Sequence, residues 1–434
     1  MADTIFALSS AAGRAGVAVV RVSGPRAGEA LKTLSAKALP KPRMAVTRQL
    51  SANGAPIDDA LALWFQGPSS FTGEDVVEFH VHGGRAILAA LFAALEGMGL
   101  RPAEAGEFTR RAVENGKFDL TRAEALADLI DAETEGQRRQ ALEQYEGRLA
   151  ALYEDWSARL LKAVAWGEAA IDFADEEVPE DCGAEARAIA AGILKEIQVH
   201  LADNHRGELV REGLYLTVLG QPNAGKSSLV NALAKRDVAI VSEQAGTTRD
   251  VVEARLDLGG YPVTVADTAG LREAAEGIEA EGIRRALARA EAADLTLLVL
   301  DGAAADPYAG LPKDLISRAS LTVWNKADLA GHPRGLAISA KTGAGLPELL
   351  TELSTLVRQR LERAVDAPPL LTRSRHRHAL ERAAEALTRA IAAPEAELMS
   401  EDLRLAQREL GRITGKVDIE DVLGVIFAEF CIGK

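Results

Sequence analysis

The pattern of apolar and polar positions divides the chain into parts of different character. In residues 1–118, short runs alternate apolar and polar positions, as half-buried strands do, because neighbouring side chains of a strand point to opposite faces. Strands are predicted at 16–22, 60–65 and 75–81, and a helix at 85–97. This mixture predicts an N-terminal α+β domain.

A long stretch rich in alanine, leucine, glutamate and arginine follows, from Thr121 to about Asp203. Its apolar residues recur at the period of an amphipathic helix: Leu126, Leu129, Ile130, Leu149, Leu152, Leu160, Leu161 and Val164. The same spacing returns near the C-terminus, at Leu380, Ala384, Leu387 and Ile391, and again at Leu403, Leu410 and Ile413. We therefore expect long helices on both sides of the middle segment.

Short apolar runs separated by helical segments fill the middle of the chain. The runs lie at 214–219, 263–266, 295–300, 321–324 and 336–338. Such a pattern is typical of a doubly wound parallel sheet, whose strands are buried on both faces. The C-terminal helices are too short a segment to form a good core alone. We therefore predict a multidomain α/β protein, with a domain at 213–364 inserted into an all-α helical domain made of 119–212 and 365–434.

Composition and charge narrow the range of functions. A length of 434 residues exceeds what one core usually serves, and 47% hydrophobic with 26% charged residues is ordinary for a globular protein. The net charge of −14 argues against broad nonspecific binding to nucleic acid. No apolar run reaches the ~18–20 residues that span a bilayer, and two cysteines argue against a disulfide framework. We expect a cytoplasmic protein without membrane association.

The densest basic cluster lies at the start of the second helical part. It comprises Arg373, Arg375, His376, Arg377 and His378. Two interpretations are open, a solvated helix start and a contact with phosphate groups of RNA.

A glycine-rich loop directly after the run 214–219 predicts phosphate binding. In the sequence Gly220-Gln-Pro-Asn-Ala-Gly-Lys-Ser227, successive backbone N–H groups would point into a hollow, and a helix N-terminus would add its dipole. Lys226 would reach the β- and γ-phosphates of a nucleotide, and Ser227 would supply a hydroxyl to Mg²⁺.

The sequence Asn325-Lys326-Ala327-Asp328 predicts which base is bound. Guanine presents an N1–H and an exocyclic amine side by side, and the Asp328 carboxylate accepts both hydrogen bonds. A buried Asp328 would be left unpaired by adenine, and a site of that kind rejects a mismatched ligand by roughly 10⁴-fold. The amide of Ala340, in Ser339-Ala340-Lys341, would reach guanine O6, and Lys326 would brace the loop. The chain should bind GTP and not ATP.

Two further segments carry the remaining nucleotide contacts. Thr248 is the candidate for a second hydroxyl on Mg²⁺, Asp267 would hold the ion through water, and the Gly270 amide would sense the γ-phosphate. The full set of predicted GTP-binding residues is Gly220, Asn223, Ala224, Gly225, Lys226, Ser227, Ser228, Thr247, Thr248, Asp267, Gly270, Asn325, Lys326, Asp328, Ser339, Ala340 and Lys341.

Leu271 occupies the position after Gly270, where Ras-like enzymes carry a glutamine that orients the attacking water. A leucine cannot hydrogen-bond water, so another group is needed for fast hydrolysis. The carboxylates that follow are Glu273, Glu276, Glu279 and Glu281, and a solvated helix start also accounts for them. The amide oxygen of Asn223 would hold a monovalent cation that stabilises developing charge, or would form a local turn.

Several segments of the chain together resemble those of one protein family. They are Phe71-Thr-Gly-Glu-Asp75, Phe173-Ala-Asp-Glu-Glu177, the GTPase motifs and the closing Phe430-Cys-Ile-Gly-Lys434. Together they resemble the bacterial tRNA modification GTPase MnmE family, also called TrmE, over essentially the whole chain. The resemblance implies an N-terminal domain that binds folate and forms a homodimer, a discontinuous helical domain and an inserted Ras-like G domain.

The resemblance also implies how GTP is hydrolysed. Members of this family are K⁺-stimulated GTPases that become active when two G domains meet. The K⁺ contacts would come from Asn223, Ser242, Gln244 and Thr247. The family pattern places the acid that orients water at Glu279, and Arg249 in the loop that orders around K⁺.

The reaction and the partner follow from the same resemblance. With an FAD-containing partner of the MnmG type, in a heterotetramer, the family modifies C5 of the wobble uridine of certain tRNAs with an aminomethyl-type group. The carbon comes from a tetrahydrofolate, in its 5,10-methylene or 5-formyl form. The folate contacts fall on Arg21, Glu78, Lys117 and Lys434, and Cys431 is a hypothetical participant in the modification.

Two rival functions use other features of the chain. An RNA-binding switch GTPase of ribosome assembly shares the apolar residue at Leu271, but such proteins lack the folate domain and usually carry a basic module. A stand-alone folate enzyme would need the G domain only as structure, against which Glu279 and Asn223 argue. The net charge of −14 also favours tRNA modification over the first rival.

Overall fold

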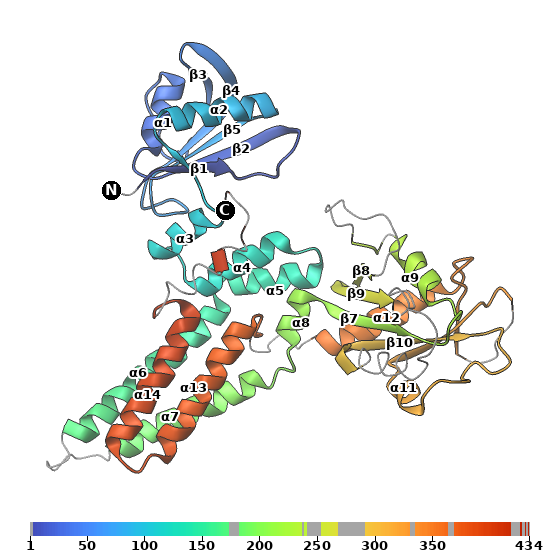
Figure 1. Ribbon diagram of the computed structural model, residues 1–434. Helices are drawn as coiled ribbons and strands as arrows, with labels where there is room; N and C mark the ends of the chain where they lie inside the picture. Colours follow the sequence, from blue (N-terminus) through green and yellow to red (C-terminus); the bar gives the residue numbers. More distant parts are fainter. Residues whose placement is uncertain are drawn as a thin grey trace, which may run out of the picture. The chain divides into compact units, whose positions relative to one another are not determined.

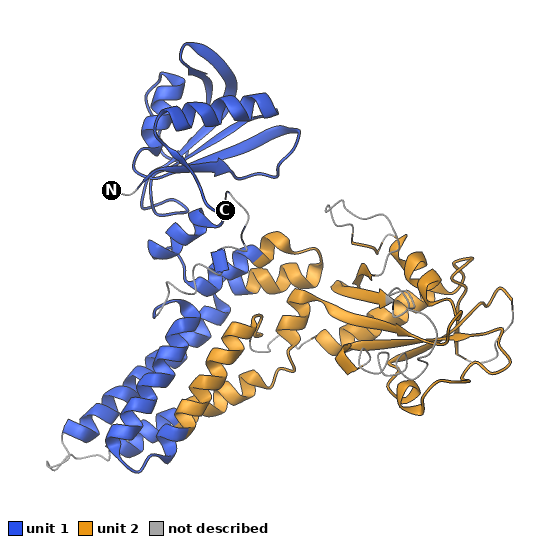
Figure 2. Ribbon diagram, in the orientation of Figure 1, with its two compact units in different colours: residues 1–127, 144–190, 389–434 blue, residues 128–143, 191–388 orange. Residues whose placement is uncertain are grey.

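A computed structural model describes residues 3–172, 182–236, 238–240, 253–267, 291–329, 335–362, 369–417, 426–427, 430 and 433. They belong to two compact units (Figure 2). The first is built from 1–127, 144–190 and 389–434, and the second from 128–143 and 191–388. These limits differ from the predicted domain limits after residues 118, 212 and 364, which stay predictions.

The first unit contains a six-stranded sheet in the order β3-β4-β5-β2-β1-β6 (Figure 1). All pairs are antiparallel except β1 with β6. The strands are β1 (Ile5–Leu8), β2 (Ala15–Ser23), β3 (Val46–Ala52), β4 (Ala55–Phe65), β5 (Val76–Gly83) and β6 (Arg101–Pro102). The predicted α+β domain is therefore confirmed. Strand β3 escaped prediction because Leu50 is its only fully buried side chain.

Helices α1 (Ala27–Ser35) and α2 (Arg85–Gly97) cover one face of this sheet. Strand β2 shows why: Ala18, Val20 and Val22 are buried against the helices, whereas the alternate residues face the other way. On that opposite face, Val17 is 56% and Leu61 is 42% exposed. The face away from α1 and α2 thus has exposed apolar side chains beside the polar residues Arg21, Glu78 and His80.

Helices make up the rest of the first unit. They include α3 (Glu107–Glu114), α4 (Leu120–Asp131), α6 (Arg148–Asp172), α7 (Cys182–Leu201) and α14 (Ala396–Thr414). Helices α6 and α14 lie side by side (Figure 1), with the Gly167 backbone against Leu403. Most of the predicted apolar stripes are buried or half-buried. Leu161 is 57% exposed, since it lies about 100° around the helix from the buried Leu160.

The second unit contains the predicted doubly wound sheet, in the order β12-β11-β10-β7-β9-β8. Its strands are β7 (Leu214–Leu219), β8 (Glu253–Leu258), β9 (Tyr261–Asp267), β10 (Leu295–Asp301), β11 (Leu321–Asn325) and β12 (Leu336–Ala337), and its helices include α9 (Lys226–Ala234), α11 (Lys313–Ser317) and α12 (Leu346–Leu361). The sheet is parallel except at β8, an antiparallel edge strand. The predicted doubly wound sheet is therefore confirmed, with one antiparallel edge strand that the Gly259-Gly260 turn joins to β9 as a hairpin.

The remaining helices of the second unit are α5 (Glu135–Tyr145), α8 (Arg206–Glu212) and α13 (Ser374–Ala392). The chain enters the nucleotide-binding part through α8 and leaves it towards α13 through residues 369–373. A Cβ added at Gly207 would lie 2.0 Å from the Leu371 carbonyl oxygen, so the entering and leaving segments touch. Within the described ranges, no helix has the length and apolarity needed to cross a membrane.

Candidate functional site

The phosphate loop joins the end of β7 to the start of α9, and two of its glycines are required by close contacts. A Cβ at Gly220 would lie 2.1 Å from the Val299 carbonyl oxygen, and one at Gly225 would lie 2.2 Å from Asn325 Nδ2. Both glycines also have positive φ angles, of 148° and 91°, which residues with a Cβ rarely adopt. The loop is therefore shaped by its neighbours as well as by its own sequence.

The polar side chains of the loop occupy distinct places. The Lys226 side chain is buried, and its Nζ donates to the carbonyl oxygens of Gly220 at 3.0 Å and Gln221 at 2.8 Å. Asn223 is exposed and adopts a left-handed conformation with φ of 62°. Ser227 and Ser228 are exposed in the first turn of α9. The Lys226 ammonium group is thus buried inside the loop, whereas the Asn223 amide and the Ser227 and Ser228 hydroxyls lie at its surface.

One buried side chain, that of Asn325, connects the nucleotide-site loops. Its Nδ2 donates to the Ala224 carbonyl oxygen at 2.8 Å, in the phosphate loop, and its Oδ1 accepts from the Ala340 amide at 3.0 Å. The Ala340 amide, predicted to contact guanine O6, is thus held by Asn325 in this structure. Sequence reasoning found Asn325 by its motif but missed this connecting role.

Asp328 lies at the surface of the predicted base-binding loop. Ser339 Oγ donates to Asp328 Oδ1 at 2.6 Å. Chiefly because of this hydrogen bond, the pKa of Asp328 lies below its ordinary value, and the charges of Lys341 and Lys326 act in the same direction. The carboxylate is exposed, not buried as the base-selectivity argument assumed. Water would therefore be excluded from the Asp328 carboxylate by the bound base itself.

Lys326 fixes this loop to the neighbouring strand. Its Nζ lies 2.6 Å from Asp301 Oδ2, at the end of β10, and its backbone φ is 66°. This contact is in keeping with the bracing role expected from the sequence. Because β7, β10, β11 and β12 are parallel, their carboxyl ends bring the phosphate loop, Asp301, Asn325 and Ser339 to one edge of the sheet.

Several predicted residues lie outside the described part of the chain. They are Ser242, Gln244, Thr247, Thr248, Arg249, Gly270, Leu271, Glu273, Glu276, Glu279, Glu281, Cys431 and Lys434, together with the segment 173–177. Strand β9 ends at Asp267, and the side chain of that residue is also outside the described set.

A second candidate site lies on the sheet of the first unit. Arg21 of β2 and Glu78 of β5 are register partners, and Arg21 Nη2 lies 2.9 Å from Glu78 Oε1. Both side chains are about one-fifth exposed. The guanidinium carbon of Arg21 lies 5.3 Å from the centre of the Phe71 ring and 5.7 Å from that of Phe108. Sequence reasoning did not connect either aromatic ring with Arg21.

The other predicted folate contacts are placed less directly. Lys117 Nζ donates to the Pro68 carbonyl oxygen at 2.7 Å, so its ammonium holds a neighbouring loop. Ser9 Oγ donates to the Gly433 carbonyl oxygen at 2.8 Å, and the Ser9 amide donates to Val19 of β2. The C-terminal Gly433 therefore lies beside the sheet that carries Arg21, next to the undescribed Lys434.

The basic cluster at the start of α13 contains two arginines that are paired with carboxylates. Arg373 Nη2 lies 2.7 Å from Asp128 Oδ1, and Arg377 Nη2 lies 2.7 Å from Asp203 Oδ1. These two arginine side chains are only 12% and 8% exposed. They hold helical segments of the second unit together, so neither is a solvated charge or a surface group for RNA.

Known proteins match this chain along its full length. A family model described as MnmE helical domain matches residues 120–431, and one described as GTP-binding protein TrmE N-terminus matches 4–117. The tRNA modification GTPase MnmE of Paramagnetospirillum magneticum is 54% identical, and its namesake from Parvibaculum lavamentivorans is also 54% identical, each with 100% of both chains covered. Among solved structures, the G domain of the T. maritima FeoB iron transporter is 24% identical over 33% of this chain and 98% of that chain, with a TM-score of 0.25.

Proposed function

This chain belongs to the tRNA modification GTPase MnmE family, and from that membership we propose that its GTP hydrolysis is K⁺-stimulated and serves C5 modification of the tRNA wobble uridine. The chain is a GTPase that takes part in tRNA modification. The finer proposal concerns the cation, the folate, the partner and the residues involved. The observation that carries its chemistry is the bridge made by Asn325 between the phosphate loop and the predicted base-binding segments.

The proposed GTP contacts follow from this bridge. Phosphates would lie in the loop of Gly220–Lys226, where backbone N–H groups and the start of α9 favour anions. The guanine edge would meet Asp328, which the low pKa keeps ionised as an acceptor. Thr247, Thr248 and Gly270 would complete the γ-phosphate contacts. A nucleotide bound in this way bridges several strand ends of one sheet, as ligands of doubly wound folds do.

The donor set fits the two proposed cations. Hydroxyl and carboxylate oxygens suit Mg²⁺, and the Ser227 hydroxyl is exposed at the start of α9, with Thr248 and Asp267 as the other proposed contacts. Asn223 presents an exposed amide from a left-handed turn in the loop, and Ser242, Gln244 and Thr247 are its proposed companions for K⁺. Mg²⁺ neutralises phosphate charge, and K⁺ stabilises the charge that develops on hydrolysis.

Water activation is proposed for Glu279, because Leu271 has no hydrogen-bonding group. A carboxylate accepts a proton from water directly or through a second water, whereas leucine only fills space. Arg249 is proposed to order the loop around the cation site. Both assignments rest on the family pattern.

The pair Arg21–Glu78 is the proposed anchor of a tetrahydrofolate, in its 5,10-methylene or 5-formyl form. Glu78 offers acceptor oxygens to the N–H edge of a pterin, and Arg21 offers donors to its carbonyl or carboxylate groups. The Phe71 and Phe108 rings beside Arg21 would hold the guanidinium in place. Lys117 and Lys434 are proposed as further contacts, and Cys431 as a participant in the modification.

For a homodimer, the N-terminal sheet offers exposed apolar side chains on the face that also carries Arg21 and Glu78. Val17 and Leu61 are exposed there, and Val19 and Leu63 are half-buried on the same face. Apolar patches of this kind mark association surfaces. An FAD-dependent partner of the MnmG type, in a heterotetramer, and tRNA as substrate complete the proposal. No observation favours the ribosome-assembly alternative.

The cation is tested by GTP turnover in K⁺ against Na⁺. We expect faster hydrolysis in K⁺, and loss of that preference in Asn223→Ala, while GDP binding is retained. Asn53→Ala is a matched control, because Asn53 is also exposed and left-handed, at a turn in the first unit. Equal turnover of the unchanged protein in both salts would refute the K⁺ mechanism.

The modification is tested by mass analysis of tRNA from cells that lack the gene. We expect the wobble uridine to lose its C5 group, and the unchanged gene to restore it. Arg21→Ala and Cys431→Ser genes should fail to restore it if the folate site and the thiol act as proposed. An unaltered wobble uridine in cells lacking the gene would remove the role altogether.

A further inference from the structure

The hairpin of β8 and β9 contacts the start of α5 through a glycine. The Gly136 amide donates to the Gly260 carbonyl oxygen at 2.7 Å, at the hairpin turn. A Cβ added at Gly136 would lie 2.7 Å from that oxygen and 2.7 Å from two carbons of the Tyr261 ring. The contact is therefore backbone against backbone and leaves no room for a side chain.

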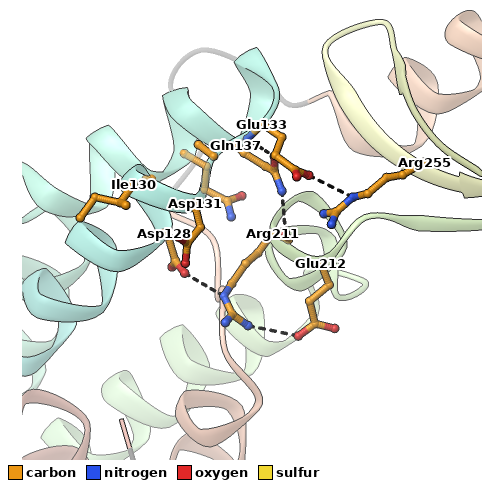
Figure 3. Close-up of a pocket in the computed structure, with 11 residues that line it drawn as sticks. Asp128, Ile130, Asp131, Glu133, Gln137, Arg211, Glu212 and Arg255 are labelled. Carbon is orange, nitrogen blue, oxygen red and sulfur yellow. Dashed lines mark hydrogen bonds and ion pairs between the residues drawn. The ribbon is translucent and has the colours of Figure 1, made fainter. Parts of the chain in front are cut away.

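Polar side chains lie near this contact. Glu133 Oε2 lies 3.1 Å from Arg255 Nε of β8 (Figure 3). Arg139 Nη2 donates to the Tyr261 hydroxyl at 3.3 Å. Gln137 Nε2 donates to the Arg211 carbonyl oxygen at 2.8 Å. These groups line or adjoin a pocket of about 580 Å³. Gly136 is thus the point of closest approach between α5 and the hairpin, and the polar contacts around it join the same two elements.

The hairpin is also the segment that joins the two predicted nucleotide-sensing stretches. Strand β8 begins at Glu253, shortly after Thr247 and Thr248, and β9 ends at Asp267, three residues before Gly270. At about 3.3 Å per residue, the six residues of β8 span roughly 20 Å between Glu253 and the Gly259-Gly260 turn. Two hydrogen-bonded strands therefore connect the ends of the hairpin to the turn that contacts α5.

Asp128, which precedes α5, is bonded both to α8, where the chain enters the nucleotide-binding part, and to residues 369–373, where the chain leaves it. Asp128 Oδ1 accepts from Arg211 Nε of α8 at 2.9 Å and from Arg373 Nη2 at 2.7 Å. The Asp128 carboxylate therefore joins the entering helix α8 to the leaving segment 369–373. The Asp128 side chain is 14% exposed, so this ion pair is well shielded from solvent.

We propose that the conformation of segment 128–143 depends on whether GTP or GDP is bound. The β8–β9 hairpin would change the position of this segment through its contact with Gly136, and Asp128 would couple that change to α8 and to residues 369–373. Gly136 is then a positioning residue for coupling, without contact to GTP. The inference rests on the proposed function in that GTP hydrolysis drives a distant modification. It concerns a conformational signal, which is measurable without tRNA or the partner protein.

The test is hydrogen–deuterium exchange of the full chain bound to GDP or to the non-hydrolysable analogue GppNHp. In the unchanged protein, amides of 135–143 should exchange at rates that differ by roughly fivefold or more between the nucleotides, the lower end of typical allosteric coupling. In Gly136→Ala this difference should vanish, while the phosphate loop and β9 keep theirs. Gly97→Ala is the matched control, because Gly97 ends a helix and a Cβ there meets nothing within 4 Å.

A second variant guards against a purely structural effect. The charge swap of Glu133→Arg with Arg255→Glu keeps an ion pair in place, so it should retain the nucleotide-dependent difference that either single change reduces. An α5 that exchanges identically with both nucleotides in the unchanged protein would overturn the proposal. So would a difference that survives in Gly136→Ala. Failure of the proposed function would show separately, as absent GTP turnover or unaltered tRNA.

Discussion

Asn325 has a structural role in this site that its sequence motif does not predict. The motif predicted a nucleotide contact, whereas the buried amide also joins the phosphate loop to Ala340. Gly225 is tied to it, because an added Cβ would meet Asn325 Nδ2 at 2.2 Å. The shape of the phosphate loop and the position of the proposed base-binding segment at Ala340 therefore depend on the same side chain.

We expect Asp328→Asn to weaken GTP binding by roughly 10²–10⁴-fold, since two hydrogen bonds to a charged acceptor are lost at about 1.5–3 kcal/mol each. Xanthosine triphosphate should bind this variant better than GTP does, because its C2 carbonyl accepts from the new amide. Titration of both nucleotides by calorimetry measures the two affinities. Retained preference for GTP would contradict the role given to Asp328.

The same carboxylate fixes the pH behaviour of base recognition. The pKa of Asp328 is lowered, so the ionised acceptor is present above the ordinary carboxyl range and is lost only when the pH falls below it. GTP affinity should consequently show no titration of this group between pH 8 and pH 5.

A further test at this scale is Gly225→Ala. We expect nucleotide affinity to fall by about tenfold or more, as overpacking of 1–3 kcal/mol implies. Gly116→Ala is the matched control: Gly116 also has a positive φ, of 66°, but a Cβ there meets nothing within 4 Å. Equal nucleotide affinity of both variants, measured by fluorescence titration, would show that the contact with Asn325 is unimportant.

What the sequence could predict differs from residue to residue. Lys226 and Asp328 were identifiable because phosphate and guanine recognition demand fixed residue types at fixed spacing. The links from Asn325 to Ala224, and from Arg21 to Phe71, were not identifiable, because they join segments that only the folded sheet brings together. Asp328 was also expected to be buried, and its place at an exposed loop explains the error.

At the scale of elements, continuous apolar runs predicted β7 and β10 well, because strands buried on both faces leave no polar alternation. Strand β8 has the alternation of a half-buried edge strand and no continuous apolar run, so the expectation of strands buried on both faces did not include it. Its antiparallel direction depends on the Gly259-Gly260 turn, which the hydrophobic pattern does not reveal. The predicted fold class is still correct, because an additional edge strand does not change the order of the other strands in the sheet.

The contact of α8 with the segment leaving the nucleotide-binding part gives a prediction for elements. Gly207→Ala should destabilise the protein by about 1–3 kcal/mol, because the new Cβ would meet the Leu371 carbonyl oxygen at 2.0 Å. Urea unfolding followed by circular dichroism measures the effect. Gly167→Ala in α6 is the control: its nearest contacts would be at 3.5 Å, so higher helix propensity should leave stability unchanged or slightly raised. A Gly207→Ala protein as stable as this control would disprove the close crossing.

For the whole molecule, a buried histidine predicts how stability depends on pH. Burial lowers the pKa of His200 to about 4, while the negative charge of Asp203 partly opposes it. Below pH 6.5 the unfolded chain binds a proton at this position that the folded chain does not, so stability falls as the pH falls towards 4. The loss between pH 7 and pH 5 should be about 2 kcal/mol.

Thermal unfolding of the unchanged protein and of His200→Gln, each at several pH values, tests this dependence. The variant should lose stability less steeply between pH 6.5 and pH 4.5, although its own stability at pH 7 is lower. Parallel curves for the two proteins would mean that His200 titrates normally in the folded state.

The basic cluster shows why charge patterns in sequence are a weak guide at this largest scale. Arg373 and Arg377 look like a patch for an anion, but their partners Asp128 and Asp203 lie far away in the sequence. Only the return of the chain to its helical part brings those carboxylates within reach. The burial of these two arginines thus depends on contacts between segments that are distant in the sequence.

The meeting of Gly207 with Leu371 has a consequence for how such a chain can arise. The segments on the two sides of the nucleotide-binding part meet there, so their ends are close together, as tolerated domain insertions require. The same geometry makes the GTPase exchangeable, so a related module of different turnover rate could be grafted at this junction without redesign of either flank.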